Sequence, residues 1–120
     1  MIEREFVKKL ATRYHATEFN ILREYAQHLF LSSLYLRKGS DSMFFKGGTA
    51  LRIIYNSPRF SEDLDFTTAK MSKSDIENLV QEALVEIEKL SISVKIDEFS
   101  STSGGYIGFL SLEIFIRKIV

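Results

Sequence analysis

Apolar residues recur with two different spacings along the chain, and each spacing marks a kind of secondary structure. Spacings of three and four residues predict helices over residues 3–14, 17–38, 49–55 and 72–90. Alternation or short apolar runs predict strands over residues 43–46, 63–68, 92–96 and 106–120, the last two joined as a hairpin by a turn at 100–105. This order of elements predicts a domain of the α/β or α+β class.

Two of the expected helices carry more specific signals. Ser72, with Asp75 three residues later, predicts a capping box at the start of the fourth helix. In the short third helix, the spacing of Leu51, Ile54 and Tyr55 predicts that these side chains face inward. The third helix is therefore expected to pack through its apolar face.

Composition agrees with one folded domain over residues 1–120, with N-terminal helices over 1–38 and a sheet with helices over 43–120. Hydrophobic residues make up 45% and charged residues 27% of the chain, as in ordinary globular domains. The absence of cysteine excludes a disulfide framework, a thiolate metal site and a cysteine nucleophile. No apolar run reaches the ~18 residues that span a bilayer. The N-terminus mixes charges of both signs, unlike a signal peptide, so the chain is expected in the cytoplasm.

The formal net charge is zero, yet the charges are unevenly distributed. Residues 1–60 hold ten basic and five acidic side chains, whereas residues 61–120 hold six basic and eleven acidic ones. The basic residues between positions 37 and 59 are Arg37, Lys38, Lys46, Arg52 and Arg59. The overall balance therefore does not exclude a phosphate-rich partner.

A pair of glycines, Gly47 and Gly48, lies between an expected strand and the third helix, which starts at Thr49. Glycines at such a turn let backbone N–H groups approach an anion closely, and the helix N-terminus adds a favourable dipole. Many strand-to-helix connections use glycine only to turn, so the pair alone is a weak signal. The spacing does not fit a P-loop, because no Gly-Lys-Ser/Thr follows.

Two aspartates, Asp63 and Asp65, are two positions apart on an expected strand and so point to the same face. Leu64 and Phe66 point to the other face, into the core. Two carboxylates on one face repel each other unless a cation lies between them, and hard oxygen ligands of this kind suit Mg²⁺. A solvent-exposed polar face is the alternative, although aspartate is depleted in strands.

The two features together are more specific than either alone. The segment FFKGGTALRIIYNSPRFSEDLDF, residues 44–66, resembles the AbiEii-type toxins of bacterial abortive-infection and toxin–antitoxin systems, which belong to the DNA polymerase β-like nucleotidyltransferase superfamily. The resemblance implies a mixed β-sheet flanked by helices. It also implies that Gly47, Gly48 and Thr49 hold a nucleoside triphosphate and that Asp63 and Asp65 bind two metal ions, Mg²⁺ or Mn²⁺.

Three further residues lie in or next to this signature. Arg59 and Ser61 precede the aspartates and would support the phosphates or the carboxylates, and Lys46 precedes the glycine turn. For Arg59, a structural salt bridge to Glu62 or another acid is as good an interpretation as support of the phosphates or carboxylates. For Lys46, contact with the nucleotide and a solvated strand end are equally good interpretations.

The superfamily requires a third carboxylate on a neighbouring strand. Glu113 is the best candidate, because it is a lone acid in an otherwise apolar strand and is costly to bury unless paired or bound to metal. The alternative is that Glu113 pairs with Arg117. Asp97 is the rival candidate for the third carboxylate.

The resemblance implies a metal-dependent nucleotidyltransferase toxin that moves a nucleotide from an NTP to an acceptor, with tRNA among the acceptors of the wider family. A cognate antitoxin is expected and a membrane partner is not. The chain ends within an apolar strand, so it is expected to be a fragment without the C-terminal helical region of the family; a terminal strand of the sheet is the other interpretation. A truncated module that binds nucleotide, RNA or antitoxin without turnover is the alternative function.

Overall fold

The chain forms a four-stranded sheet with four α-helices. The computed structural model describes residues 3–89, 92–104 and 107–119, with side chains for residues 3–89, 110–112 and 114. The helices are α1 (Arg4–Arg13), α2 (Glu18–Leu34), α3 (Gly47–Tyr55) and α4 (Lys73–Glu88), with a 3₁₀ turn over Ser40–Ser42. The strands are β1 (Met43–Lys46), β2 (Asp63–Ala69), β3 (Ile92–Gly104) and β4 (Ile107–Ile119).

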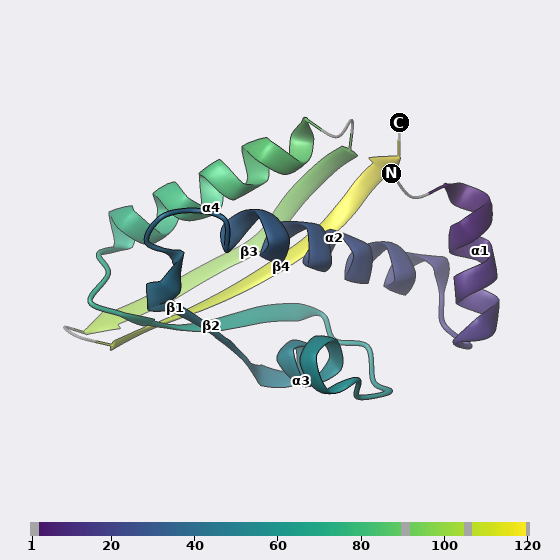
Figure 1. The fold of residues 1–120 in the computed structure, drawn as a ribbon, viewed down its shortest axis with the longest axis horizontal. Coiled ribbons are helices and arrows are strands. Elements are labelled where there is room, and N and C mark those ends of the chain that lie inside the picture. The colour runs from purple at the N-terminus through teal and green to yellow at the C-terminus, as the bar shows by residue number, and fades with distance from the viewer. Residues whose placement is uncertain (1–2, 90–91, 105–106, 120) are drawn as a thin grey trace.

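The sheet has the strand order β1-β2-β4-β3, and each of its three described pairings is antiparallel. Figure 1 shows the two long strands β3 and β4 side by side, with α2 crossing them, α4 running alongside β3 and α3 beside β2. The predicted α/β class is confirmed. The expected mixture of parallel and antiparallel pairs is not found in these pairings. Strands β2 and β3 run in the same direction, but β4 lies between them and is antiparallel to both.

The core lies between the sheet and the helices α2 and α4, which also pack on each other. In β2, Leu64 and Phe66 are fully buried in this core, whereas Asp63 is exposed and Asp65 is partly buried. Leu110 and Leu112 of β4 are buried on the same side as Leu64 and Phe66. The predicted division of β2 into an apolar and an acidic face is therefore confirmed, and the acidic face is the one that α2 and α4 leave uncovered.

The end of α2 was predicted too late in the chain. The helix ends at Leu34 rather than near Lys38, because the N–H groups of Leu36 and Arg37 bond to carbonyls only three residues back and Gly39 then adopts a left-handed φ of 93°. The Tyr35 hydroxyl donates to the Met43 carbonyl oxygen at 2.7 Å. This hydrogen bond joins the end of α2 to the start of β1.

The last two strands pair as the predicted hairpin, but their pairing extends into the segment that was expected to be the turn. Ser100–Gly104 was predicted as part of the turn, and instead it pairs residue by residue with Ile107–Ser111 of β4. Continuous pairing with a partner strand outweighs the low strand preference of a serine- and glycine-rich segment. The hairpin is consequently longer than the apolar alternation alone indicates.

The α3 helix is oriented differently from the prediction. It begins at Gly47, and Leu51, Ile54 and Tyr55 are 55%, 59% and 75% exposed instead of facing inward. The buried residues of this helix are Thr49 and Ala50. Polar contacts, made by Thr49 with β2 and by Arg52 with α2, hold the helix against the domain. The apolar stripe of α3 therefore lies on the surface.

The capping box at the start of α4 is confirmed. The Asp75 N–H donates to the Ser72 Oγ at 3.1 Å, and the Ser72 N–H donates to the Asp75 carboxylate at 3.2 Å. Both bonds satisfy N–H groups that have no partner inside the helix. Local sequence alone therefore sets where α4 begins.

The orientation of α3 can be tested with two substitutions of the same kind. Ile76→Ala removes a side chain that is 2% exposed in the core and should cost about 2–5 kcal/mol of unfolding free energy. Ile54→Ala removes a side chain that is 59% exposed and should cost less than about 1 kcal/mol. Urea denaturation measures both losses. Equal losses would show that the apolar stripe of α3 is buried.

Candidate active site

The turn from β1 into α3 lies directly against the acidic face of β2. Gly47 adopts a φ of 85°, which is a left-handed conformation that favours glycine. A Cβ atom on Gly47 would lie 2.8 Å from Asp65 Oδ2, closer than real Cβ contacts allow. Both the backbone conformation and the limited space therefore favour glycine at this position, and the Asp65 carboxylate lies against the backbone of the turn.

The next two residues of the turn also contact the segment around β2. A Cβ atom on Gly48 would lie 3.3 Å from Ser61 Oγ, so Ser61 packs closely on the second glycine. Thr49 is fully buried, and its hydroxyl donates to the backbone carbonyl of Asp63. The Thr49 hydroxyl thus ties the first turn of α3 to the beginning of β2.

Asp65 is held from the other side by a residue that the sequence did not single out. Ser111 Oγ of β4 donates to Asp65 Oδ1 at 2.7 Å. Ser111 stands opposite Asp65 in the register between β2 and β4, and Lys46 stands opposite Asp65 in the register between β1 and β2. Residues that are directly opposite share a face of the sheet, so Lys46, Asp65 and Ser111 form a row across three strands.

The backbone register also places the two candidates for the third carboxylate. Glu113 of β4 stands directly opposite Asp63 of β2. Asp97 lies at an irregularity of the edge strand β3, which β4 separates from β2. The side chains of Glu113, Asp97 and Arg117 lie outside the described residues, so the expected pairing of Glu113 with Arg117 lies there too. Strand position favours Glu113, because it is on the strand next to the aspartates.

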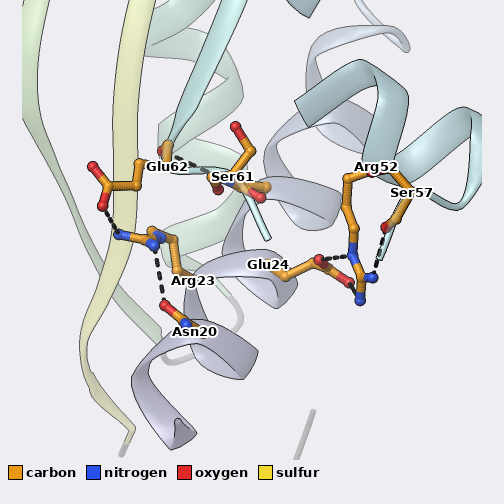
Figure 2. A network of polar contacts seen from close by, with 8 residues as sticks. Asn20, Arg23, Glu24, Arg52, Ser57, Ser61 and Glu62 are labelled. Atoms are coloured by element: carbon orange, nitrogen blue, oxygen red, sulfur yellow. Dashed lines mark hydrogen bonds and ion pairs between the residues drawn. The ribbon is translucent and has the colours of Figure 1, made fainter. Parts of the chain in front are cut away.

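The segment before β2 is held by α2, as Figure 2 shows. Gln27, which is almost fully buried, donates from Nε2 to the carbonyl oxygens of Ser61 at 2.9 Å and Glu62 at 3.3 Å. The Glu62 carboxylate lies 3.9 Å from the Arg23 guanidinium. The salt bridge of Glu62 is therefore with Arg23 and not with Arg59, which is exposed.

A second contact in Figure 2 joins α3 to α2. Arg52 Nε donates to a Glu24 carboxylate oxygen at 2.7 Å, and Arg52 also donates to the Ser57 carbonyl oxygen at 2.9 Å. Its guanidinium lies over the Phe60 ring, 4.0 Å from the centroid. Arg52 therefore holds α3 against α2. Two other basic residues are exposed: Lys46, which precedes the glycine turn, and Arg59, which precedes the aspartates.

The donor atoms on this face suit a divalent cation. Asp63 and Asp65 supply carboxylate oxygens from one face of β2, and such oxygens are the ligands that Mg²⁺ and Mn²⁺ prefer. Among the side chains that the structure describes, no group of three His, Cys, Asp or Glu residues is arranged to hold a metal. The pair thus fits an ion whose further ligands are water, substrate phosphates or Glu113.

Fold and site together define the class of protein. A glycine turn that opens a helix lies beside two carboxylates on an adjacent strand, and nucleotidyl transfer requires groups of these kinds to bind phosphates and a cation. The family model of the nucleotidyl transferase AbiEii toxin, from a type IV toxin–antitoxin system, matches residues 29–110, about two thirds of the chain. The chain belongs to this family of toxin-type nucleotidyltransferases, and the resemblance drawn from residues 44–66 is confirmed.

Two comparisons gave no relatives, since no curated protein and no solved structure matched the chain. Among the described residues, no helix combines the length and apolar character needed to cross a membrane.

The close contact at Gly47 can be tested by comparing its alanine variant with that of Gly39, a glycine with a similar backbone conformation. Gly39 has a φ of 93°, with open space around the position of a Cβ atom. Gly39→Ala should therefore cost only the strain of a left-handed alanine, about 1–2 kcal/mol of unfolding free energy. Gly47→Ala should cost at least about 1 kcal/mol more, because the new methyl group must displace Asp65. Chemical denaturation measures the unfolding free energy of both variants. Equal losses would contradict the close contact between Gly47 and Asp65.

The role of Gln27 can be tested in the same way. Gln27→Leu keeps the volume but removes both hydrogen bonds to the segment before β2, and should cost about 1–3 kcal/mol of unfolding free energy. The exposed Gln81 of α4 provides the control, because Gln81→Leu should change stability by less than about 0.5 kcal/mol. Thermal and urea unfolding measure both variants. If Gln27→Leu lowers the unfolding free energy no more than Gln81→Leu does, Gln27 does not stabilise the segment before β2.

Proposed function

We propose that the chain is a metal-dependent nucleotidyltransferase that moves a nucleotide from a nucleoside triphosphate to an acceptor hydroxyl. The observation that carries this proposal is the contact between the glycine turn and Asp65 Oδ2. It brings the expected phosphate-binding backbone and the expected metal-binding carboxylate together. Residues 48–64 lie between Gly47 and Asp65 in the chain and include the rest of α3 and the loop that follows it. The contact is therefore made by folding and not by closeness in the sequence.

The turn and its neighbours are proposed to bind the triphosphate. The N–H groups of Gly47 and Gly48 open α3, where the helix dipole favours an anion. Lys46 and Arg59, both exposed, would add positive charge to the phosphates. Ser61 packs on Gly48, where its hydroxyl is close enough to the turn to support the same phosphates.

Asp63, Asp65 and Glu113 would hold the metal ions, which when bound offset phosphate charge and stabilise both the attacking and the leaving oxygens. The acceptor hydroxyl oxygen attacks the α-phosphorus, and the bond from this phosphorus to the bridging oxygen breaks to release pyrophosphate. A carboxylate of the pair accepts the proton of the hydroxyl. The exposed position of Asp63 suits contact with an incoming acceptor.

The acceptor is proposed to be an RNA, with the 3′ end of tRNA as the first candidate. The family description supports a toxin with a cognate antitoxin. We propose the cytoplasm as the compartment of the reaction, since nucleoside triphosphates and RNA meet there. A module that binds nucleotide without turnover is the second candidate, and product formation separates the two.

The transfer reaction is tested with charge-neutral variants of the aspartates. Asp63→Asn and Asp65→Asn should each lower transfer of a labelled nucleotide to total RNA by at least about 100-fold, because each removes an ionised carboxylate that would hold the metal ions. Both should also relieve growth arrest on expression. Asp41→Asn, at an exposed position of the 3₁₀ turn, is the control and should keep full activity.

The outcomes distinguish the two candidate functions. Full transfer by both site variants would overturn the assignment. Binding of an NTP by the parent chain without any labelled product would favour the binding module.

A further inference from the structure

We propose that Ser111 is a positioning residue that fixes the orientation of the Asp65 carboxylate and thereby sets the affinity of the site for a divalent cation. This inference rests on the proposed function, because it assumes that Asp65 is a metal ligand. It adds a residue outside the glycine turn and the acidic strand.

The two oxygens of Asp65 have different surroundings. Oδ1 accepts a hydrogen bond from Ser111 Oγ at 2.7 Å. Oδ2 lies against the turn, 2.8 Å from where a Cβ atom on Gly47 would be. The carboxylate is therefore held between β4 on one side and the backbone of the turn on the other, with Oδ2 directed to the proposed phosphate site.

A carboxylate without such a bond rotates easily, because the terminal torsion of aspartate has a broad, two-fold preference. The Ser111 hydroxyl selects one orientation by engaging Oδ1. The lone pairs of Oδ2 then remain directed toward the turn, where a cation could bind Asp65 and a phosphate together. Fixing a ligand before the ion arrives raises affinity, as hydrogen bonds to metal ligands commonly do.

Ser111 is itself held rigidly. Its neighbours in β4, Leu110 and Leu112, are buried in the core on the opposite face of the sheet. A donor that is anchored on both sides along its strand can position a ligand precisely enough for binding. The strand pairing and the core therefore determine where the hydroxyl points.

A serine in the core shows how a purely structural hydroxyl differs. Ser33 of α2 is buried, and its Oγ donates to the Ala83 carbonyl oxygen of α4 at 3.0 Å. Removing that hydroxyl should lower stability without any change at the acidic face. Ser33→Ala is therefore the matched control for Ser111→Ala.

The test measures binding of Mn²⁺ alone to the full chain by electron paramagnetic resonance, without nucleotide. Ser111→Ala should weaken Mn²⁺ binding by about 10-fold or more, since lost hydrogen bonds to metal ligands typically cost about 10–100-fold. Ser111→Thr, which keeps the hydroxyl, should restore affinity close to that of the parent. Ser33→Ala should bind Mn²⁺ like the parent even where its melting temperature falls.

A second variant covers the case in which Ser111→Ala folds poorly. Ser111→Cys has a similar size but a much weaker donor, so it should also weaken Mn²⁺ binding while circular dichroism shows the parent fold. Parent-like affinity in a folded Ser111→Ala or Ser111→Cys variant would overturn the proposal. An equal loss of affinity in Ser33→Ala would overturn it too, because the effect would then be general.

The failure of this inference differs from the failure of the proposed function. If Asp63→Asn loses Mn²⁺ binding while Ser111→Ala binds like the parent, the positioning role of Ser111 is wrong and the proposed metal site stands. If both Asp63→Asn and Asp65→Asn bind Mn²⁺ like the parent, the proposed metal site is itself wrong.

Discussion

The alternation of β2 is the constraint on which the rest of the site depends. One face of this strand buries Leu64 and Phe66 in the core, and the other carries Asp63 and Asp65. A slip of one residue would move both aspartates into the apolar core and both apolar residues out of it. The cost of burying two carboxylates therefore fixes the register that the site needs, so core packing and site geometry are one and the same requirement.

Helix α2 connects the core to the site. Its apolar residues, among them Phe30, are buried against the sheet. Its polar residues Gln27 and Glu24 hold the segment before β2 and the helix α3, respectively. The glycine turn and the aspartates are thus supported by the same helix, although each belongs to a different element.

Signals that lie within one short segment were predictable from the sequence. The limits of β1, the capping box of Ser72 and the two faces of β2 depend on neighbouring residues, and the structure agrees with them. Contacts between distant segments were not predictable, because no local pattern encodes how strands that are far apart in the chain pair. The hydrogen bond of Ser111 follows from the register of β2 with β4, and the outward stripe of α3 with Ile54 follows from the polar contacts that hold this helix.

The separation of Asp65 and Ser111 along the chain has a consequence for synthesis. The two residues are 46 positions apart, and β4 is the last of the four described strands to be made. Because β4, which carries Ser111, leaves the ribosome after the other three described strands, the hydrogen bond to Asp65 cannot form on a shorter nascent chain. The hydrogen-bonded arrangement of Asp65 is thus one of the last features of the described sheet to become possible during synthesis.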